Sequence, residues 1–190
     1  MFKLKLSDIL ITIVIALVFG VIYRLWSPVY ESLGPFGLHV DQLLYGMWFI
    51  AATVAFLIIR KAGVALLAEV AASSGELIMG SEYGLEVLIY GFLQGLFAEA
   101  VFAILRYKSY SLMTVSLAAI ASCLASFIMD FYKGYIDELV WWNLALFLLF
   151  RFIGSILISG VLAYYLVKAL EATGVTTLIR GATKEDYESL

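Results

Sequence analysis

Six apolar segments, each close to the length needed to cross a lipid bilayer, dominate this sequence. A transmembrane helix needs about 20 predominantly apolar residues, and such segments lie near residues 8–26, 40–59, 62–80, 84–105, 110–131 and 143–169. Hydrophobic residues make up 64% of the 190-residue chain and charged residues only 14%, which leaves too little polar surface for a water-soluble fold of this size. The sequence therefore predicts an all-α integral membrane protein, a single domain over residues 1–190 with six transmembrane helices and a short polar tail over about 171–190.

The basic residues predict how the chain is oriented in the membrane. Lysine and arginine gather on the cytoplasmic side of membrane proteins. With the N-terminus inside, the inner side receives Lys3, Lys5, Arg60, Lys61, Arg106, Lys108, Lys168, Arg180 and Lys184, and the outer side only Arg24 and Lys133. We therefore expect both termini to be cytoplasmic. The outer side is acidic, which either concentrates a cationic solute or reflects only the polarity of loops.

The predicted helices after the first carry polar and aromatic residues along one face. In chain order these are Tyr45 and Trp48; Glu69, Ser73 and Glu76; Tyr83, Glu86, Tyr90 and Gln94; Ser126 and Asp130; and Asn143 and Arg151. Lipid cannot satisfy polar groups, so these faces must converge on the bundle interior or on a water-filled cavity. Most of them lie in the outer half of the predicted membrane, which indicates a concave site with aromatic walls and a few convergent polar groups.

Two glutamates have more than one interpretation. Glu99 lies deeper than the predicted site and on another side of its helix, so it is either a structural partner of Arg151 or a partner of donors at a helix end. Glu69 lies at a similar depth and belongs either to the site or to this structural group. A carboxylate at the centre of a membrane helix costs about 2.5–3.5 kcal/mol on insertion scales, so each needs a partner or a function.

The first predicted helix carries small residues at intervals of four. Thr12, Ala16 and Gly20 form a ridge of the kind that marks helix–helix contacts in membranes. Such a ridge packs against a helix of the same chain or docks on a partner protein, and its spacing alone does not decide between the two.

Motifs for catalysis and for bound metals or nucleotides are missing from the sequence. It contains no G-x-x-x-x-G-K-[ST] nucleotide loop and no H-E-x-x-H pair. The single histidine and single cysteine are far apart, which makes a zinc site implausible. A net charge of −3 gives no indication of nucleic-acid binding. We therefore expect a protein that is not an enzyme, with no cofactor and no metal.

The segment YGMWFIAATVAFLIIRKAGVALLAEVAASSGELIMGSEYGLEVLIYGFLQGLFAEAVFA, residues 45–103, resembles the YkoE family. The resemblance rests on its AE-V-A, GE, YGFLQG and AE elements and continues more weakly through the last two helices. Members of this family are substrate-binding (S) components of energy-coupling factor (ECF) vitamin transporters. The resemblance implies a six-helix S-component fold in a bacterial plasma membrane, and uptake of thiamine or its hydroxymethylpyrimidine precursor (HMP). It also implies partners: a transmembrane coupling subunit, on which the Thr12, Ala16 and Gly20 ridge would dock, and two ATPase subunits.

The same resemblance gives the polar faces a ligand. A carboxylate can pair with the amine and ring nitrogen of an aminopyrimidine, and aromatic faces and carboxylates favour the thiazolium cation of thiamine. The predicted ligand-binding residues are Trp48, Glu69, Glu76, Tyr83, Glu86, Tyr90, Gln94, Glu99, Asp130 and Asn143. Two other functions stay open: a stand-alone ion-coupled carrier with Glu69 and Glu99 as proton or cation sites, and a helper subunit whose carboxylates only pair with Arg151.

Overall fold

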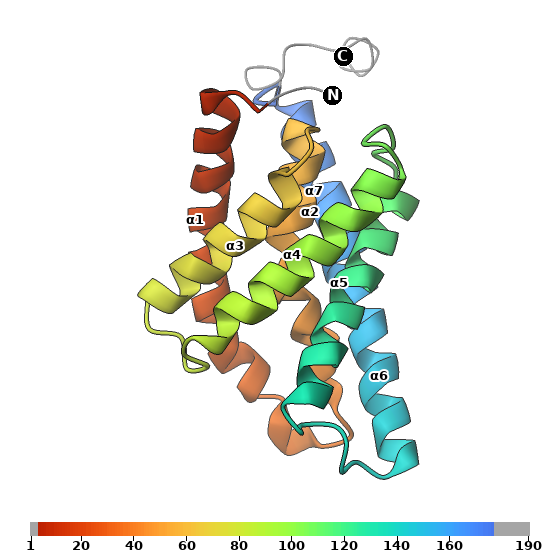
Figure 1. Ribbon diagram of the computed structural model, residues 1–190. Helices are drawn as coiled ribbons and strands as arrows, with labels where there is room; N and C mark the ends of the chain where they lie inside the picture. Colours follow the sequence, from red (N-terminus) through yellow and green to blue (C-terminus); the bar gives the residue numbers. More distant parts are fainter. Residues whose placement is uncertain (1–3, 177–190) are drawn as a thin grey trace.

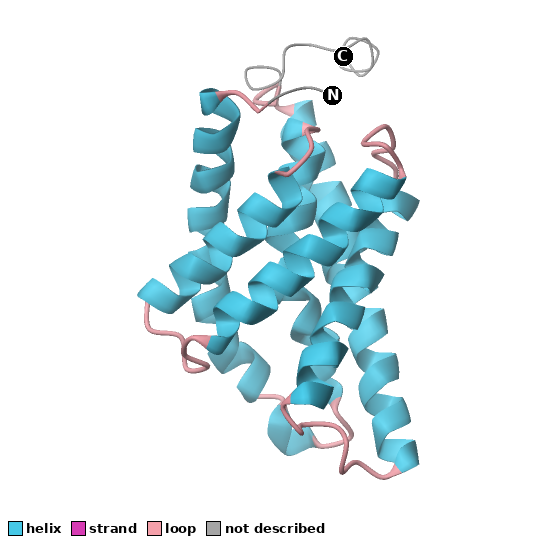
Figure 2. Ribbon diagram, in the orientation of Figure 1, coloured by secondary structure: helices cyan, strands magenta, loops and turns pink. Residues whose placement is uncertain are grey.

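The computed structural model describes residues 4–176, and every regular element in that range is a helix (Figures 1 and 2). Residues 177–190, which include most of the predicted tail, lie outside the described part of the chain. The α-helices are α1 (Leu6–Glu31), α2 (Ile50–Ile59), α3 (Val64–Ile78), α4 (Glu86–Ile104), α5 (Leu112–Tyr132), α6 (Trp141–Ser155) and α7 (Ala163–Ala172). Two 3₁₀-helical segments, η1 (Gly34–Phe36) and η2 (Val40–Phe49), lie between α1 and α2, and a π-helical segment, η3 (Ile156–Leu162), joins α6 to α7.

Five stretches are long and apolar enough to cross a membrane: Leu6–Phe36, Val40–Ile59, Glu86–Ile104, Leu112–Tyr132 and Trp141–Ala172. They confirm five of the six predicted segments. The remaining segment, 62–80, contains α3, which has 15 residues. A helix of this length reaches about 22 Å, less than the roughly 30 Å of a bilayer's hydrocarbon core. The count of six spans therefore stays a prediction.

The bundle has two clearly different ends. The start of α1, the end of α7 and the α2–α3 and α4–α5 connections lie at one end, at the top of Figure 1. The connections over 32–39, 79–85 and 133–140 lie at the other end. Arg60, Lys61, Arg106 and Lys108 all belong to the upper connections. The basic residues are thus segregated toward the end where the first helix starts.

The second predicted span is not one continuous α-helix. Phe49, at the junction of η2 and α2, has φ −142° and ψ 17°, outside the helical range. The first amide groups of an α-helix have no acceptor within it, and here side chains from elsewhere accept them. Ala51 N donates to the Tyr23 hydroxyl (3.0 Å) and Ala52 N to Glu69 Oε2 (3.1 Å). The side chain of Glu69 thus caps the start of α2.

The Thr12, Ala16 and Gly20 ridge packs within the chain. All three residues are buried, and a Cβ atom added to Gly20 would lie 2.9 Å from the carbonyl oxygen of Ala72 in α3. Since the ridge is covered by α3, it offers no surface to a partner in this structure. Docking of this ridge on a partner stays a prediction. The exposed face of α1 is instead apolar, with Leu10, Val14 and Leu17 among its residues, as a lipid-facing surface should be.

A close backbone contact joins η2 to α6. A Cβ atom added to Gly154 would overlap the carbonyl group of Leu43 and lie 2.6 Å from its Cα atom, and one added to Gly46 would lie 2.8 Å from the Gly154 carbonyl oxygen. Such separations require the backbones to move apart. Gly154 also lies one turn after Arg151, so this contact sets where α6 places that side chain.

We expect Gly154→Ala to destabilise the protein by about 1–3 kcal/mol, as overpacking of a closely packed interior does. Thermal unfolding of the detergent-purified chain measures the effect. Gly34→Ala is the matched control, because a Cβ atom at Gly34 would meet nothing within 4 Å. Equal melting temperatures for the two variants would contradict the close contact.

Candidate functional site

A cavity of about 270 Å³ lies near the end of the bundle opposite the basic connections. Its residues come from α1, η2, the α3–α4 and α5–α6 connections, and α3 to α6. They are Tyr23, Tyr30, Gln42, Tyr45, Trp48, Ser73, Glu76, Tyr83, Glu86, Val87, Tyr90, Gly91, Gln94, Asp130, Tyr135, Phe147 and Arg151. Such a cavity, largely aromatic with a few polar groups, is typical of small-molecule binding sites.

Trp48 is at the centre of an aromatic cluster that forms one wall. Its ring centroid lies 5.0 Å from that of Tyr30, 5.6 Å from Tyr45 and 6.1 Å from Tyr83. The contacts with Tyr30 and Tyr83 are edge-to-face, a favoured geometry for aromatic pairs. Burial raises the pKa of Tyr83, in the α3–α4 connection, to about 12, so its ring is neutral at physiological pH. The wall can thus stack on a flat ligand without adding charge.

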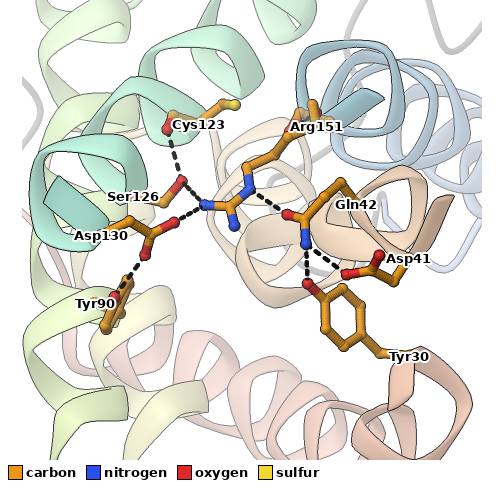
Figure 3. Close-up of polar contacts among 9 residues, drawn as sticks. Tyr30, Asp41, Gln42, Tyr90, Cys123, Ser126, Asp130 and Arg151 are labelled. Carbon is orange, nitrogen blue, oxygen red and sulfur yellow. Dashed lines mark hydrogen bonds and ion pairs between the residues drawn. The ribbon is translucent and has the colours of Figure 1, made fainter. Parts of the chain in front are cut away.

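Arg151, on α6, organises a second wall (Figure 3). Its Nε donates to Gln42 Oε1 (2.7 Å), and its Nη1 donates to Ser126 Oγ (3.1 Å) and pairs with Asp130 Oδ2. The other Asp130 oxygen, Oδ1, accepts from the Tyr90 hydroxyl at 2.6 Å. The guanidinium carbon also lies 3.6 Å from the centroid of the Tyr45 ring. This buried cation is therefore neutralised by Asp130 and held by groups from two other elements, η2 and α5.

The carboxylates that line the cavity differ in their partners. Asp130 pairs with Arg151. Glu86, at the start of α4, pairs with Lys133 and accepts from the Tyr135 hydroxyl at 3.3 Å, and the Glu86 carboxylate raises the pKa of Lys133 above its ordinary value. The negative charge of Glu86 is thus compensated by Lys133 at the edge of the cavity, where the Glu86 side chain is partly exposed.

Glu76 is the exception. It is 1% exposed, and its Oε1 accepts a hydrogen bond from Ser81 Oγ at 3.0 Å. Among residues 4–176 no cationic side chain pairs with it. A buried carboxylate without a cation is costly, so this position favours a ligand that supplies positive charge or hydrogen-bond donors.

The structure brings seven of the predicted ligand-binding residues to the cavity. These are Trp48, Glu76, Tyr83, Glu86, Tyr90, Gln94 and Asp130. Trp48 belongs to η2, Tyr83 to the α3–α4 connection, and the other five to α3, α4 and α5. Their contact with a ligand stays a prediction.

Three predicted residues lie away from the cavity lining. Glu69 caps α2 behind Tyr23, whose hydroxyl donates to Glu69 Oε2 at 3.1 Å. Glu99 performs the same task for α3: its carboxylate accepts from the amides of Gly63 (2.6 Å), Ala65 (3.0 Å) and Leu66 (3.3 Å). Glu99 is therefore found with donors at a helix end rather than with Arg151, one of the two structural partners considered for it. Asn143 Oδ1 lies 2.8 Å from His39 Nε2, beside the connections over 32–39 and 133–140.

Several residues of the cavity were not among the predicted ones. Tyr23 and Tyr30 reach it from α1, Gln42 from η2 and Phe147 from α6. The sequence could have identified Arg151 as a site residue, because a lone arginine inside an apolar segment marks a functional or structural centre. Tyr30 and Gln42 gave no such signal, because both lie near a predicted loop where polar residues are common.

Comparisons with known proteins give a consistent result. Residues 7–125 match the family model of the ABC-type cobalt transport system, permease component. The chain is 39% identical over 173 residues to the Bacillus subtilis (strain 168) protein YkoE, named as a candidate HMP/thiamine permease. That alignment covers 90% of this chain and 86% of the relative. A crystal structure of an S component of an ECF transporter superposes with a TM-score of 0.88 and 36% identity, covering 93% of this chain and 90% of the other.

Proposed function

This chain belongs to the YkoE family of S components of ECF transporters, and we propose that it captures thiamine or HMP from outside the cell for uptake. The relatives are transport components rather than enzymes, and binding and release involve no covalent step. The cavity described above is the proposed binding site.

The observation that carries this proposal is the uncompensated Glu76 inside an aromatic cavity. Glu86 and Asp130 have cationic partners within the chain, whereas Glu76 has none among the described residues. An aminopyrimidine offers an amine and a ring nitrogen side by side, which a carboxylate can engage through charge-assisted bonds. The thiazolium ring of thiamine is a cation that aromatic faces such as Trp48 and Tyr83 attract. Thiamine and HMP therefore supply what Glu76 lacks.

Several finer features follow from the same proposal. We place the chain in a bacterial plasma membrane with both termini cytoplasmic and with α3 as a sixth, shorter crossing. The segregation of Arg60, Lys61, Arg106 and Lys108 toward one end supports this orientation, and the cavity then lies in the outer half. A separate transmembrane coupling subunit and two ATPase subunits would supply the energy, in agreement with the missing nucleotide-binding loop.

Titration of the detergent-purified chain tests the proposal. We expect thiamine and HMP to quench tryptophan fluorescence saturably, because Trp48 lines the cavity while Trp26, Trp141 and Trp142 do not, and riboflavin to have no effect. Trp48→Phe should abolish most of the quenching while calorimetry still detects binding. Absence of heat and of quenching with both pyrimidine compounds would contradict the proposed function.

A further inference from the structure

One terminal nitrogen of Arg151 is not used by the protein. A guanidinium carries five N–H groups. The single Nε–H donates to Gln42, and the two Nη1 hydrogens serve Ser126 and Asp130. No described residue accepts a hydrogen bond from Nη2, which Figure 3 shows without a dashed line. Since Arg151 lines the cavity, this nitrogen offers two donors to whatever occupies it.

The side-chain nitrogen of Gln94, on α4, has no hydrogen-bond partner among residues 4–176 either. Gln94 is 1% exposed and lines the same cavity. Leaving a buried donor unpaired costs about 1–3 kcal/mol. A ligand atom that accepts a hydrogen bond would remove this cost.

Asp130 cancels the charge of Arg151 without competing for the ligand. One of its oxygens accepts from Arg151 and the other from the Tyr90 hydroxyl, so both point into the network. Asp130 is thus a positioning residue. The Arg151 wall presents N–H donors but little net positive charge, which suits a neutral oxygen better than a phosphate group.

The hydrogen-bond acceptor Glu76 and the donors of Arg151 lie on different walls of the cavity. Glu76 belongs to α3 and Arg151 to α6, and in Figure 1 α4 and α5 lie between these two helices. A ligand that fills the cavity can therefore meet both only with different ends.

We propose that the cavity binds its ligand in one orientation, with a neutral hydroxyl oxygen at Arg151 Nη2 and Gln94 and the amine or cationic part at Glu76. This inference rests on the proposed function and defines its specificity. The site selects an alcohol at the end of the ligand away from its amine, as the hydroxyethyl group of thiamine is, and discriminates against the phosphate ester. A phosphate would meet a donor wall whose charge Asp130 already neutralises.

The test compares ligands that differ by one oxygen. Calorimetry would measure HMP against its analogue with methyl in place of hydroxymethyl, and thiamine against its analogue with ethyl in place of hydroxyethyl. We expect loss of the hydroxyl group of thiamine to weaken binding to the unmodified chain about 10-fold or more, as the loss of a hydrogen bond to a charged donor does. The HMP pair is the comparison, because its hydroxymethyl group lies beside the amine and should contribute less to binding. The phosphate esters should bind more weakly than the alcohols.

Arg151→Lys distinguishes a direct contact from a structural role. Lysine keeps the charge beside Asp130 but loses the forked donor geometry, so the hydroxyl and deoxy compounds should then bind within about 3-fold of each other. Gln94→Met provides a second variant if the first unfolds. Arg24→Lys is the matched control, because Arg24 pairs with Glu82 and does not line the cavity.

Three results would overturn the inference. The first is an ethyl analogue of thiamine that binds the unmodified chain as well as thiamine does. The second is a fall in affinity, on loss of the ligand's hydroxyl group, that is as large in both cavity variants as in the unmodified chain. The third is tighter binding of a phosphate ester than of its alcohol. If neither parent compound binds at all, the proposed function itself fails, and this inference fails with it.

Discussion

Replacing Glu76 with glutamine is expected to weaken thiamine binding about 100-fold, since a hydrogen bond to a charged group contributes about 1.5–3 kcal/mol and each 1.4 kcal/mol is tenfold in affinity. The substitution keeps the size of the side chain and its contact with Ser81, but it removes the one cavity carboxylate that has no cationic partner among the described residues. HMP carries no permanent charge, so we expect a smaller loss, about 10-fold.

Glu82→Gln is the matched control for this experiment. Glu82 is an exposed carboxylate in the same α3–α4 connection as Ser81, and it pairs with Arg24 at 3.2 Å outside the cavity. Removing the charge of Glu82 should change thiamine affinity by less than about 3-fold, because this charge acts on the ligand only at long range. Calorimetry measures the thiamine affinity of both variants. Equal affinities of the Glu76 variant and the unmodified chain would remove Glu76 from the site.

Replacing Glu69 with leucine is expected to lower the stability of the protein by about 2–4 kcal/mol, because two buried donors lose their acceptor. Tyr23 Oη and Ala52 N both donate to Glu69 Oε2, and both are enclosed by protein. Glu69→Gln retains a carbonyl oxygen at this place, so we expect it to cost less than about 1 kcal/mol. Thermal unfolding of the purified variants measures the difference.

The glutamine variant also separates capping from ion transport. If Glu69 serves as the cap of α2, the Glu69→Gln chain should bind thiamine with unchanged affinity and remain folded. A glutamine variant as unstable as the leucine variant would show that the negative charge itself is required. That outcome would be a reason to test the alternative function, an ion-coupled carrier in which intramembrane glutamates exchange protons or cations.

Periodicity predicted the parts of the site that depend on the angular position of a residue around its own helix. Glu76, Tyr90 and Gln94 reach the cavity because their faces turn inward, and this angle follows from spacing alone. Spacing does not give the neighbour that each face meets. Gly20 of the small-residue ridge, for example, lies against α3 of the same chain, a neighbour that spacing alone does not identify.

The break at Phe49 could not be predicted from the sequence. Residues 47–52 around the break are all apolar, and residues 40–59 contain no proline, so no residue beside Phe49 indicates an interrupted helix. The break depends on acceptors and donors that arrive from distant segments, among them Ser159, whose hydroxyl donates to the Phe49 carbonyl oxygen at 3.2 Å. Glu69 and Glu99 have their roles for the same reason: each caps a helix other than its own, and only the assembled bundle reveals which.

The capped start of α2 has a consequence for how the chain is made. Lipid offers no hydrogen-bonding groups, so every backbone amide in a membrane must find an acceptor within the protein. The amides of Ala51 and Ala52 find theirs on α1 and α3, and α3 leaves the ribosome after α2. The second segment therefore cannot hold its broken form in the bilayer as an independent unit. That form is complete only when the glutamate-bearing third segment has followed it, so the first three segments reach their final structure together.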